Sequence, residues 1–165
     1  MPDSPAVAVS KRYFDAVRRR DLDAALECWV PGGIDHLAPV GELRVPDEWR
    51  AYFSELFAAI PDWKYEVLNL FEQGDQVACH WRAKGHFSGQ PFQGLRATGA
   101  AIAAEGADLI KVENGLIKRL DSYWDESATA RQIGLLPAKK SVPERALYGL
   151  FNTKTRLKSA IRRRA

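Results

Sequence analysis

The feature that most constrains the fold of this chain is a change in hydrophobic spacing at Tyr65. Before it, apolar side chains recur at i, i+3, i+4, i+7, i+8 and i+11, as one continuous helical stripe: Trp49, Tyr52, Phe53, Leu56, Phe57 and Ile60. From Tyr65 onward, apolar and polar residues alternate, as on an antiparallel strand with one buried face. We therefore predict an α+β domain in which helices precede a curled antiparallel sheet.

Capping residues indicate where the first helices begin. Ser4-Pro5 is typical of an N-cap followed by proline in the first turn, and it predicts a helix to about Arg20. Asp21 caps a second, short helix that we extend to Trp29 and end at Pro31-Gly32-Gly33. Pro46-Asp47 starts the striped third helix.

Turn signals divide the second half of the chain into strands. Gly74-Asp75 and Asn114-Gly115 are hairpin turns, and Gly134 stops a short closing helix. The predicted strands and closing helix cover Tyr65–Phe71, Val77–Phe87, Ile102–Val112, Leu116–Trp124 and Asp125–Ile133. On the second strand, apolar residues alternate with His80, Arg82 and Lys84, so we expect a charged outer face that also holds Arg119 and Asp121.

The C-terminal part of the chain is strongly basic. Residues 137–165 contain nine Lys or Arg and one acidic residue, Glu144, and carry a net charge of +8. Because the whole chain carries +3, residues 1–136 carry −5. We expect the α+β domain to cover 1–136 and a basic amphipathic tail, helical in its spacing, to cover 137–165. The apolar residues of one tail face are Leu147, Leu150, Phe151, Leu157 and Ile161.

Several roles are open for this tail. It can lie on an anionic membrane surface, dock on an acidic protein partner, pack on the acidic domain, or remain a partly disordered solubilising end. A nucleic acid is a poor candidate, because the tail has no stacking platform or recognition motif.

Neither the cysteines nor the apolar runs of the sequence are typical of a secreted or membrane-embedded protein. Cys28 and Cys79 stand singly in apolar surroundings and are typical of buried free thiols, so we expect a cytoplasmic protein. The N-terminus lacks the pattern of a targeting signal, and no run approaches the ~18 apolar residues that span a bilayer. With three His residues, none at ligand spacing, we expect no metal.

Motifs in the second half of the chain resemble the SnoaL-like polyketide cyclases of the nuclear-transport-factor-2-like superfamily. They are Gly85-His86-Phe87-Ser88-Gly89 with Phe92, Gly94 and Thr98-Gly99, the hairpin from Gly106 to Ile117, and Tyr123-Trp124-Asp125 with Arg131 to Leu135. Asp21-Leu22-Asp23 and Asp35-His36 match weaker features, and the resemblance covers roughly residues 6–136. It implies a cone-shaped sheet with the N-terminal helices on its concave face, a ligand pocket, and a homodimer through the outer face.

The same resemblance implies several functions, and this sequence departs from the family at three of the positions that carry them. Known members include cyclases that use an Asp in the last strand, helped by His residues, and the superfamily also holds isomerases, dehydratases and epoxide hydrolases. Ser122 stands at that Asp position, Leu120 at a His position, and Phe87 at the His of the glycine loop. Limonene-type epoxide hydrolases also place a catalytic Asp at the position of Ser122.

Asp108 is the main catalytic candidate. The resemblance places it at a pocket-facing position, and strand parity puts Ser122 on the same side. Burial in an apolar cavity disfavours the charged carboxylate and raises its pKa toward the range useful for a general base. The alternative is a buried structural carboxylate that hydrogen-bonds Ser122 or a backbone amide.

The other candidates are polar groups at the pocket mouth and aromatic walls. His36 can relay a proton near neutral pH, unless Asp35 only caps a turn and His36 is solvated. Asp121 is a candidate for a displaced catalytic acid, but its parity points away from the pocket. The expected substrate-binding residues, which can equally be plain core, are Asp35, Trp49, Phe53, Trp81, Phe87, Leu120 and Trp124.

These residues lead to three hypotheses about function. The first is a cofactor-independent enzyme that moves a proton next to a carbonyl in a small apolar substrate, giving cyclisation, isomerisation or dehydration. Asp108 is then the base, with Ser122 and His36 holding the enolate oxygen or relaying the proton. The second is a non-catalytic small-molecule binding domain, or an epoxide hydrolase-like enzyme. The third is an interaction module recruited to a membrane or partner by its tail.

Overall fold

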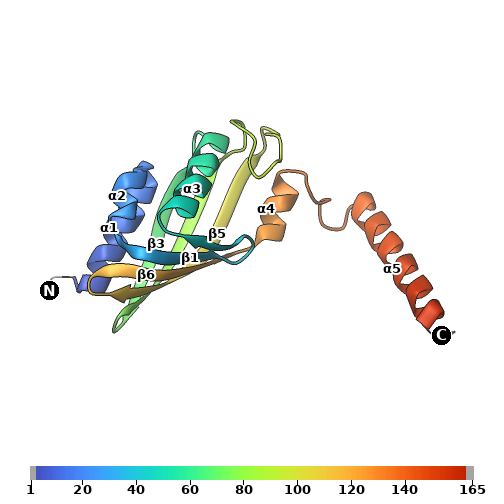
Figure 1. The fold of residues 1–165 in the computed structure, drawn as a ribbon. Helices are drawn as coiled ribbons and strands as arrows, with labels where there is room; N and C mark the ends of the chain where they lie inside the picture. The colour runs from blue at the N-terminus through green and yellow to red at the C-terminus, as the bar shows by residue number, and fades with distance from the viewer. Residues whose placement is uncertain (1–2, 163–165) are drawn as a thin grey trace.

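Six strands form one curled sheet in the computed structural model, which describes residues 3–162 (Figure 1). The strand order is β2-β1-β6-β5-β4-β3, and every neighbouring pair is antiparallel except β1 and β6, which are parallel. The strands are β1 (Trp29–Leu37), β2 (Gly41–Arg44), β3 (Lys64–Gln73), β4 (Gln76–His86), β5 (Ala101–Glu113) and β6 (Leu116–Trp124). The helices are α1 (Pro5–Arg19), α2 (Leu22–Leu26), α3 (Asp47–Ala59), α4 (Glu126–Gln132) and α5 (Val142–Arg162). The predicted α+β class and curled sheet are confirmed.

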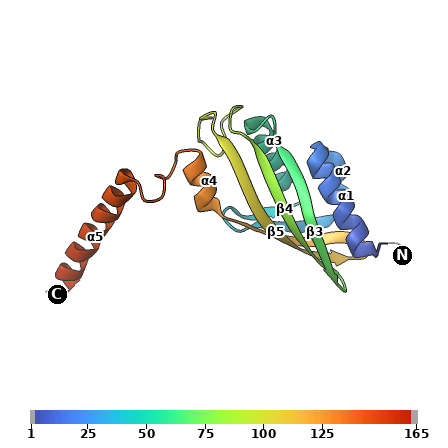
Figure 2. The ribbon, with the colours of Figure 1, turned by 180° about the vertical axis from the view of Figure 1, so that it is seen from behind.

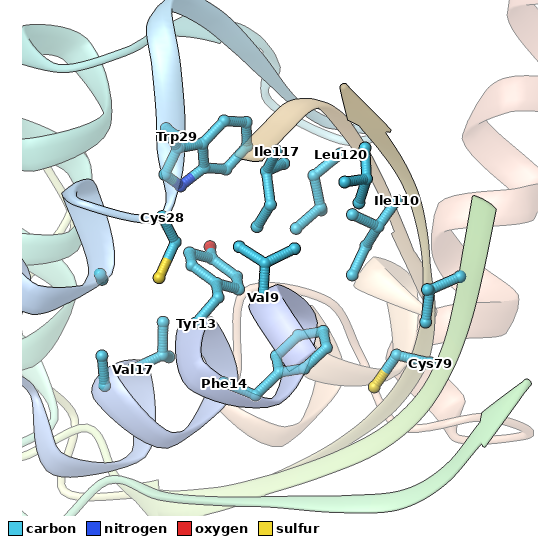
Figure 3. Close-up of a cluster of buried hydrophobic side chains, with 14 of the residues drawn as sticks. Val9, Tyr13, Phe14, Val17, Cys28, Trp29, Cys79, Ile110, Ile117 and Leu120 are labelled. Carbon is cyan, nitrogen blue, oxygen red and sulfur yellow. The ribbon is translucent and has the colours of Figure 1, made fainter. Parts of the chain in front are cut away.

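The N-terminal helices begin where their caps predict. The side chain of Ser4 accepts a hydrogen bond from the Val7 amide, and that of Asp21 accepts one from the Ala24 amide. The buried side of α1 packs into the concave face of the sheet (Figure 3). Its side chains Val9, Tyr13, Phe14 and Val17 lie beside Cys28, Cys79, Ile110, Ile117 and Leu120. Both cysteines are buried free thiols, as predicted.

The segment between α2 and α3 differs from the sequence prediction. The second helix ends at Leu26, and Trp29 begins a strand that runs straight through Pro31-Gly32-Gly33. A Cβ at Gly33 would lie 2.8 Å from the Trp29 ring, so a larger residue at this position would displace that indole. The register slips between Trp29 and Ile34. Because this bulge interrupts the alternation, helical spacing and strand spacing could not be told apart there.

The remaining strands form a meander joined by the predicted turns. Asn114 and Gly115 both have positive φ angles, 52° and 77°, as a type I′ hairpin turn requires. On β4 the inward residues Val77, Cys79, Trp81 and Ala83 are buried. The outward residues carry polar pairs: His80 lies 2.7 Å from Glu105, and Arg82 forms an ion pair with Glu66 at 2.8 Å. The expected charged outer face is therefore present.

The chain leaves the cone through α4 and α5. The Asp125 side chain caps α4 by accepting from the Ala128 amide at 2.9 Å, and Gly134 follows with φ +82°. Figures 1 and 2 show α5 standing clear of the sheet, and an ion pair of 3.0 Å between Arg131 and Glu144 ties its first turn to α4. The side chains of Leu157 and Ile161 lie outside the described ones. Within residues 3–162, no helix has the length and apolar character that crossing a membrane requires.

Candidate active site

A cavity of about 220 Å³ lies between the concave face of the sheet and the helices α1, α3 and α4. Its walls are mostly aromatic and aliphatic, and its buried polar groups are concentrated on two carboxylates, Asp35 and Asp108, with Ser122. The sequence-predicted residues that line it are Asp35, Phe53, Trp81, Phe87, Asp108, Leu120, Ser122 and Trp124. Two predicted site residues, His36 and Trp49, are not among its lining residues.

Asp108 is held at the base of the cavity by groups on both neighbouring strands. Its Oδ1 atom accepts hydrogen bonds from the Ser122 hydroxyl and from the Trp81 indole N–H, each at 2.6 Å. Ser122 lies directly opposite Asp108 on β6. Trp81 lies opposite Gly106 on β5, and its ring passes over that glycine toward Asp108. A Cβ at Gly106 would lie 2.5 Å from the indole ring, so a side chain there would block this path. The sequence therefore builds two convergent donors around one carboxylate.

The environment of Asp108 raises its pKa. Burial raises the pKa to about 6, against the opposing effect of hydrogen bonds donated by Ser122, Trp81 and Tyr65, which favour the anion. Near neutral pH the carboxylate is therefore mostly ionised yet still basic enough to accept a proton. Buried carboxylates without such donors stay protonated to higher pH.

Asp35 is a second carboxylate in the same cavity, with a poorer set of partners. It is 1% exposed, its Oδ2 atom accepts from the Trp49 indole N–H at 3.0 Å, and its Oδ1 atom has no partner among the described residues. Burial and then the negative charge of Asp108 raise the pKa of Asp35 well above its usual range. Of the two carboxyl groups, Asp35 therefore holds its proton more readily, and Asp108 is the more readily ionised.

Tyrosines complete the polar part of the cavity, and the sequence prediction missed them. Tyr13, Tyr52 and Tyr65 line the cavity, and burial raises the pKa of each phenol above its usual range. Their hydroxyls therefore remain proton donors at neutral pH. In the sequence, Tyr13 and Tyr52 belong to apolar helical stripes and do not differ from core residues. Tyr65 lies on the same face of the predicted sheet as Trp81, and this was the one signal that could have indicated a cavity position.

The structure places His36 on the outer face of the sheet, which corrects its predicted catalytic role. Its Nδ1 atom lies 3.0 Å from Asp121 Oδ1, and Asp121 also accepts hydrogen bonds from Arg119. The reason is strand parity: Asp35 points inward on β1, so its neighbour points outward. Asp35 is a buried strand residue and does not cap a turn, and Asp121 faces away from the cavity as predicted.

Trp49 lies behind the cavity wall and positions groups that form it. Its side chain is fully buried, its indole N–H donates a hydrogen bond to Asp35, and its ring stacks on Phe53 with centroids 4.3 Å apart.

Within the part of the chain that the structure describes, no three His, Cys, Asp or Glu side chains gather as metal ligands would. The buried polar groups of the cavity include two carboxyl groups and the side chains that donate hydrogen bonds to them.

Comparisons with known proteins identify the family and the fold of this chain. A family model for SnoaL-like polyketide cyclases matches residues 7–133. A candidate SnoaL-like polyketide cyclase from Jannaschia sp. CCS1 is 21% identical and has a TM-score of 0.73, with 83% of this chain and 99% of that chain covered.

Two further solved structures have the same fold. AclR, a candidate hydroxylase from Streptomyces galilaeus, is 18% identical with a TM-score of 0.71, covering 95% of this chain and 94% of that chain. IdmH, a candidate polyketide cyclase from Streptomyces antibioticus, is 21% identical with a TM-score of 0.67, covering 78% and 98%. A search of curated proteins found no match. At these identities the likeness to solved structures establishes the fold.

Proposed function

The chain belongs to the SnoaL-like polyketide cyclase family, and from this premise we propose that it is a cofactor-independent enzyme acting next to a carbonyl group. The observation that carries the proposal is the pair of buried carboxyl groups in one apolar cavity, with Asp108 the more readily ionised. Environments that push two pKa values apart assign one group as base and the other as acid at the same pH.

In the proposed reaction, Asp108 is the general base. Its carboxylate takes a proton from the carbon next to the substrate carbonyl, and the electron pair of that C–H bond moves to the carbonyl oxygen as an enolate. Ser122 and Trp81 hold Asp108 through its Oδ1 atom, which fixes the orientation of the carboxylate. This arrangement replaces the last-strand Asp of the family by a carboxylate one strand away, hydrogen-bonded to Ser122.

Asp35 is the general acid in the same step. Its proton hydrogen-bonds to the carbonyl oxygen and transfers as negative charge develops there, which lowers the barrier to enolisation. The enol then returns its O–H proton to Asp35 as its carbon end reacts. In an isomerisation, a conjugated carbon takes the proton held by Asp108. In a ring closure, the enol carbon attacks a second carbonyl of the same substrate, and the oxygen of that carbonyl takes the Asp108 proton. In a dehydration, a hydroxyl on the next carbon leaves as water with the Asp108 proton.

A binding domain without catalysis is the second candidate function. The saturation of Asp108 Oδ1 by two donors favours it, because such a carboxylate also satisfies the rule that buried polar groups are hydrogen-bonded. A binding domain would retain a ligand without exchanging its protons, and this difference is measurable.

Hydrogen exchange tests the proposed function without knowledge of the natural product. The full chain is incubated in D₂O with a panel of cyclic and aromatic ketones, and deuterium at the carbon next to the carbonyl is followed by NMR. We expect catalysed exchange without added cofactor, falling on the acid side with an apparent pKa near that of Asp108, about 6. Binding of panel members without any catalysed exchange would favour the binding domain instead.

The outer sheet face supports a further part of the proposal, a homodimer. Phe71, Leu109 and Tyr123 are each about half exposed or more on this face, and Tyr123 lies edge-on to His36 with ring centroids 6.4 Å apart. Large exposed apolar side chains on one face support an interaction surface there. We expect sedimentation equilibrium to give a dimer that Leu109→Glu dissociates; a wild-type monomer at all concentrations would exclude it.

A further inference from the structure

The tail helix α5 exposes a set of bulky side chains that the cone does not cover. The exposed fractions lie between 47% and 72% for its large apolar and aromatic residues, Val142, Leu147, Tyr148, Leu150 and Phe151. In both ribbon views the helix stands apart from the sheet, with its first turn nearest to α4 (Figures 1 and 2). Exposed apolar side chains gathered on one element indicate a surface that binds another molecule.

Three of these side chains lie along one side of the helix. Leu147, Leu150 and Phe151 are spaced i, i+3 and i+4, so they adjoin one another on one face. Arg145 and Arg156 lie toward the other side of the helix, while Lys154 lies on the same side as the apolar face, one turn beyond Leu150. A long basic side chain in that position can extend past an apolar layer and keep its charge in water.

The charge exposed by α5 is of one sign. The acidic residue of its first turn, Glu144, is buried and paired with Arg131 at 3.0 Å, and it also accepts from the Tyr148 hydroxyl at 3.1 Å. Through Arg156, where description of the side chains ends, the exposed charged groups of the helix are therefore Arg145, Lys154 and Arg156. The sequence of the tail beyond them is basic as well.

We propose that α5 is a membrane-surface helix that lies in the headgroup layer of a bilayer rich in anionic phospholipid. Such a surface accommodates both features of the helix, since acyl chains take up Leu150 and Phe151 while phosphate groups neutralise the basic side chains. A nucleic acid would use the charge but leave the apolar face in water. The ion pair between Arg131 and Glu144 then holds the cone beside the membrane, on the side of α4, which lines the cavity.

Vesicle co-sedimentation of the full chain tests this proposal. We expect binding to vesicles of phosphatidylcholine with about 30 mol% phosphatidylglycerol and roughly tenfold or more weaker binding to phosphatidylcholine alone. Leu150→Ser/Phe151→Ser and, separately, Lys154→Glu/Arg156→Glu should each weaken the binding by about tenfold or more, because each removes one of the two contributions.

A matched control separates the tail from net charge. Lys64→Glu/Lys84→Glu reverses two exposed charges on the cone and should leave vesicle binding within about twofold of wild type. Unchanged thermal unfolding of all three variants shows that the cone is intact. Equal binding to both kinds of vesicle, equal loss in the cone control, or tighter binding to double-stranded DNA or an acidic polypeptide than to anionic vesicles would each overturn the proposal.

Discussion

Asp108→Asn is expected to lower the rate of proton exchange next to a substrate carbonyl by about 10²–10⁴-fold, the range that a positioned general base contributes. The amide keeps the shape of the side chain and an oxygen that can accept from Ser122 and Trp81, but it cannot take up a proton. The measurement is the initial rate of deuterium incorporation in D₂O at saturating ketone, with binding followed separately by calorimetry.

Asp121→Asn is the matched control for that variant. Asp121 is a carboxylate of the adjacent strand, but it pairs with Arg119 and His36 on the outer face. Its substitution should change the exchange rate by less than about threefold, because it does not reach the cavity. A rate that falls in Asp121→Asn and survives in Asp108→Asn would reject Asp108 as the base.

The same Asp108→Asn variant should gain stability relative to the wild type as the pH rises. The pKa of Asp108 rises from 3.8 to about 6 on folding, so the folded state holds the proton more tightly than the unfolded state. Its contribution to stability is therefore fully present below about pH 4 and is lost as the pH rises through about 6, at a cost of roughly 3 kcal/mol. Between about pH 4 and pH 8, the free energy of unfolding of Asp108→Asn relative to wild type should rise by about that amount.

Denaturant unfolding across pH measures this difference, and Asp75 provides a control of opposite sign. The hydrogen bond from Lys111 lowers the pKa of Asp75, so its ionised form is favoured by folding. The stability of Asp75→Asn relative to wild type should therefore fall with rising pH, at lower pH than for Asp108. Parallel pH profiles of stability for the wild type and Asp108→Asn would mean that burial does not raise the pKa of Asp108.

The alternation of the later strands predicted the central pair of the site. Asp108 has the same parity as the buried Ile110, and Ser122 has the same parity as the buried Leu120, so alternation within each strand puts both on the inner face. The same alternation puts Asp121 on the outer face. Counting outward from Asn114-Gly115 would instead pair Asp108 with Asp121, and a register shift between Lys111 and Val112 sets Asp108 opposite Ser122. Alternation was therefore sufficient for the face of each residue but not for the pairing.

The acid of the site was not predictable in the same way. The strand holding Asp35 begins with the bulge after Trp29 and pairs in parallel with β6, so no hairpin connects it to a register that counting could follow. Both Asp35 and His36 were consequently expected at the pocket, although only Asp35 lines the cavity. The indole donors of Trp49 and Trp81 were interpreted as walls, since spacing indicates burial but not which way an N–H bond points.

Asp35→Asn is the second substitution with a large expected effect, and its signature lies in the pH dependence. The wild-type exchange rate should decline on the acid side as Asp108 takes up a proton, near pH 6, and on the alkaline side as Asp35 loses one. The amide introduced by this substitution would still donate a hydrogen bond but could not transfer a proton. We expect a rate about 10²-fold lower and loss of the alkaline decline, while the acid-side decline stays near pH 6.

Comparison with His36→Asn assigns this effect to the cavity. His36 is adjacent to Asp35 in sequence but contacts Asp121 on the outer face, so its substitution should leave both the rate and the pH profile unchanged. The pair of carboxylates also makes the reverse assignment testable, because both residues line the cavity and Asp35 Oδ1 has no hydrogen-bond partner among the described residues. If Asp35→Asn removed the acid-side decline and Asp108→Asn the alkaline one, Asp35 would be the base and Asp108 the acid.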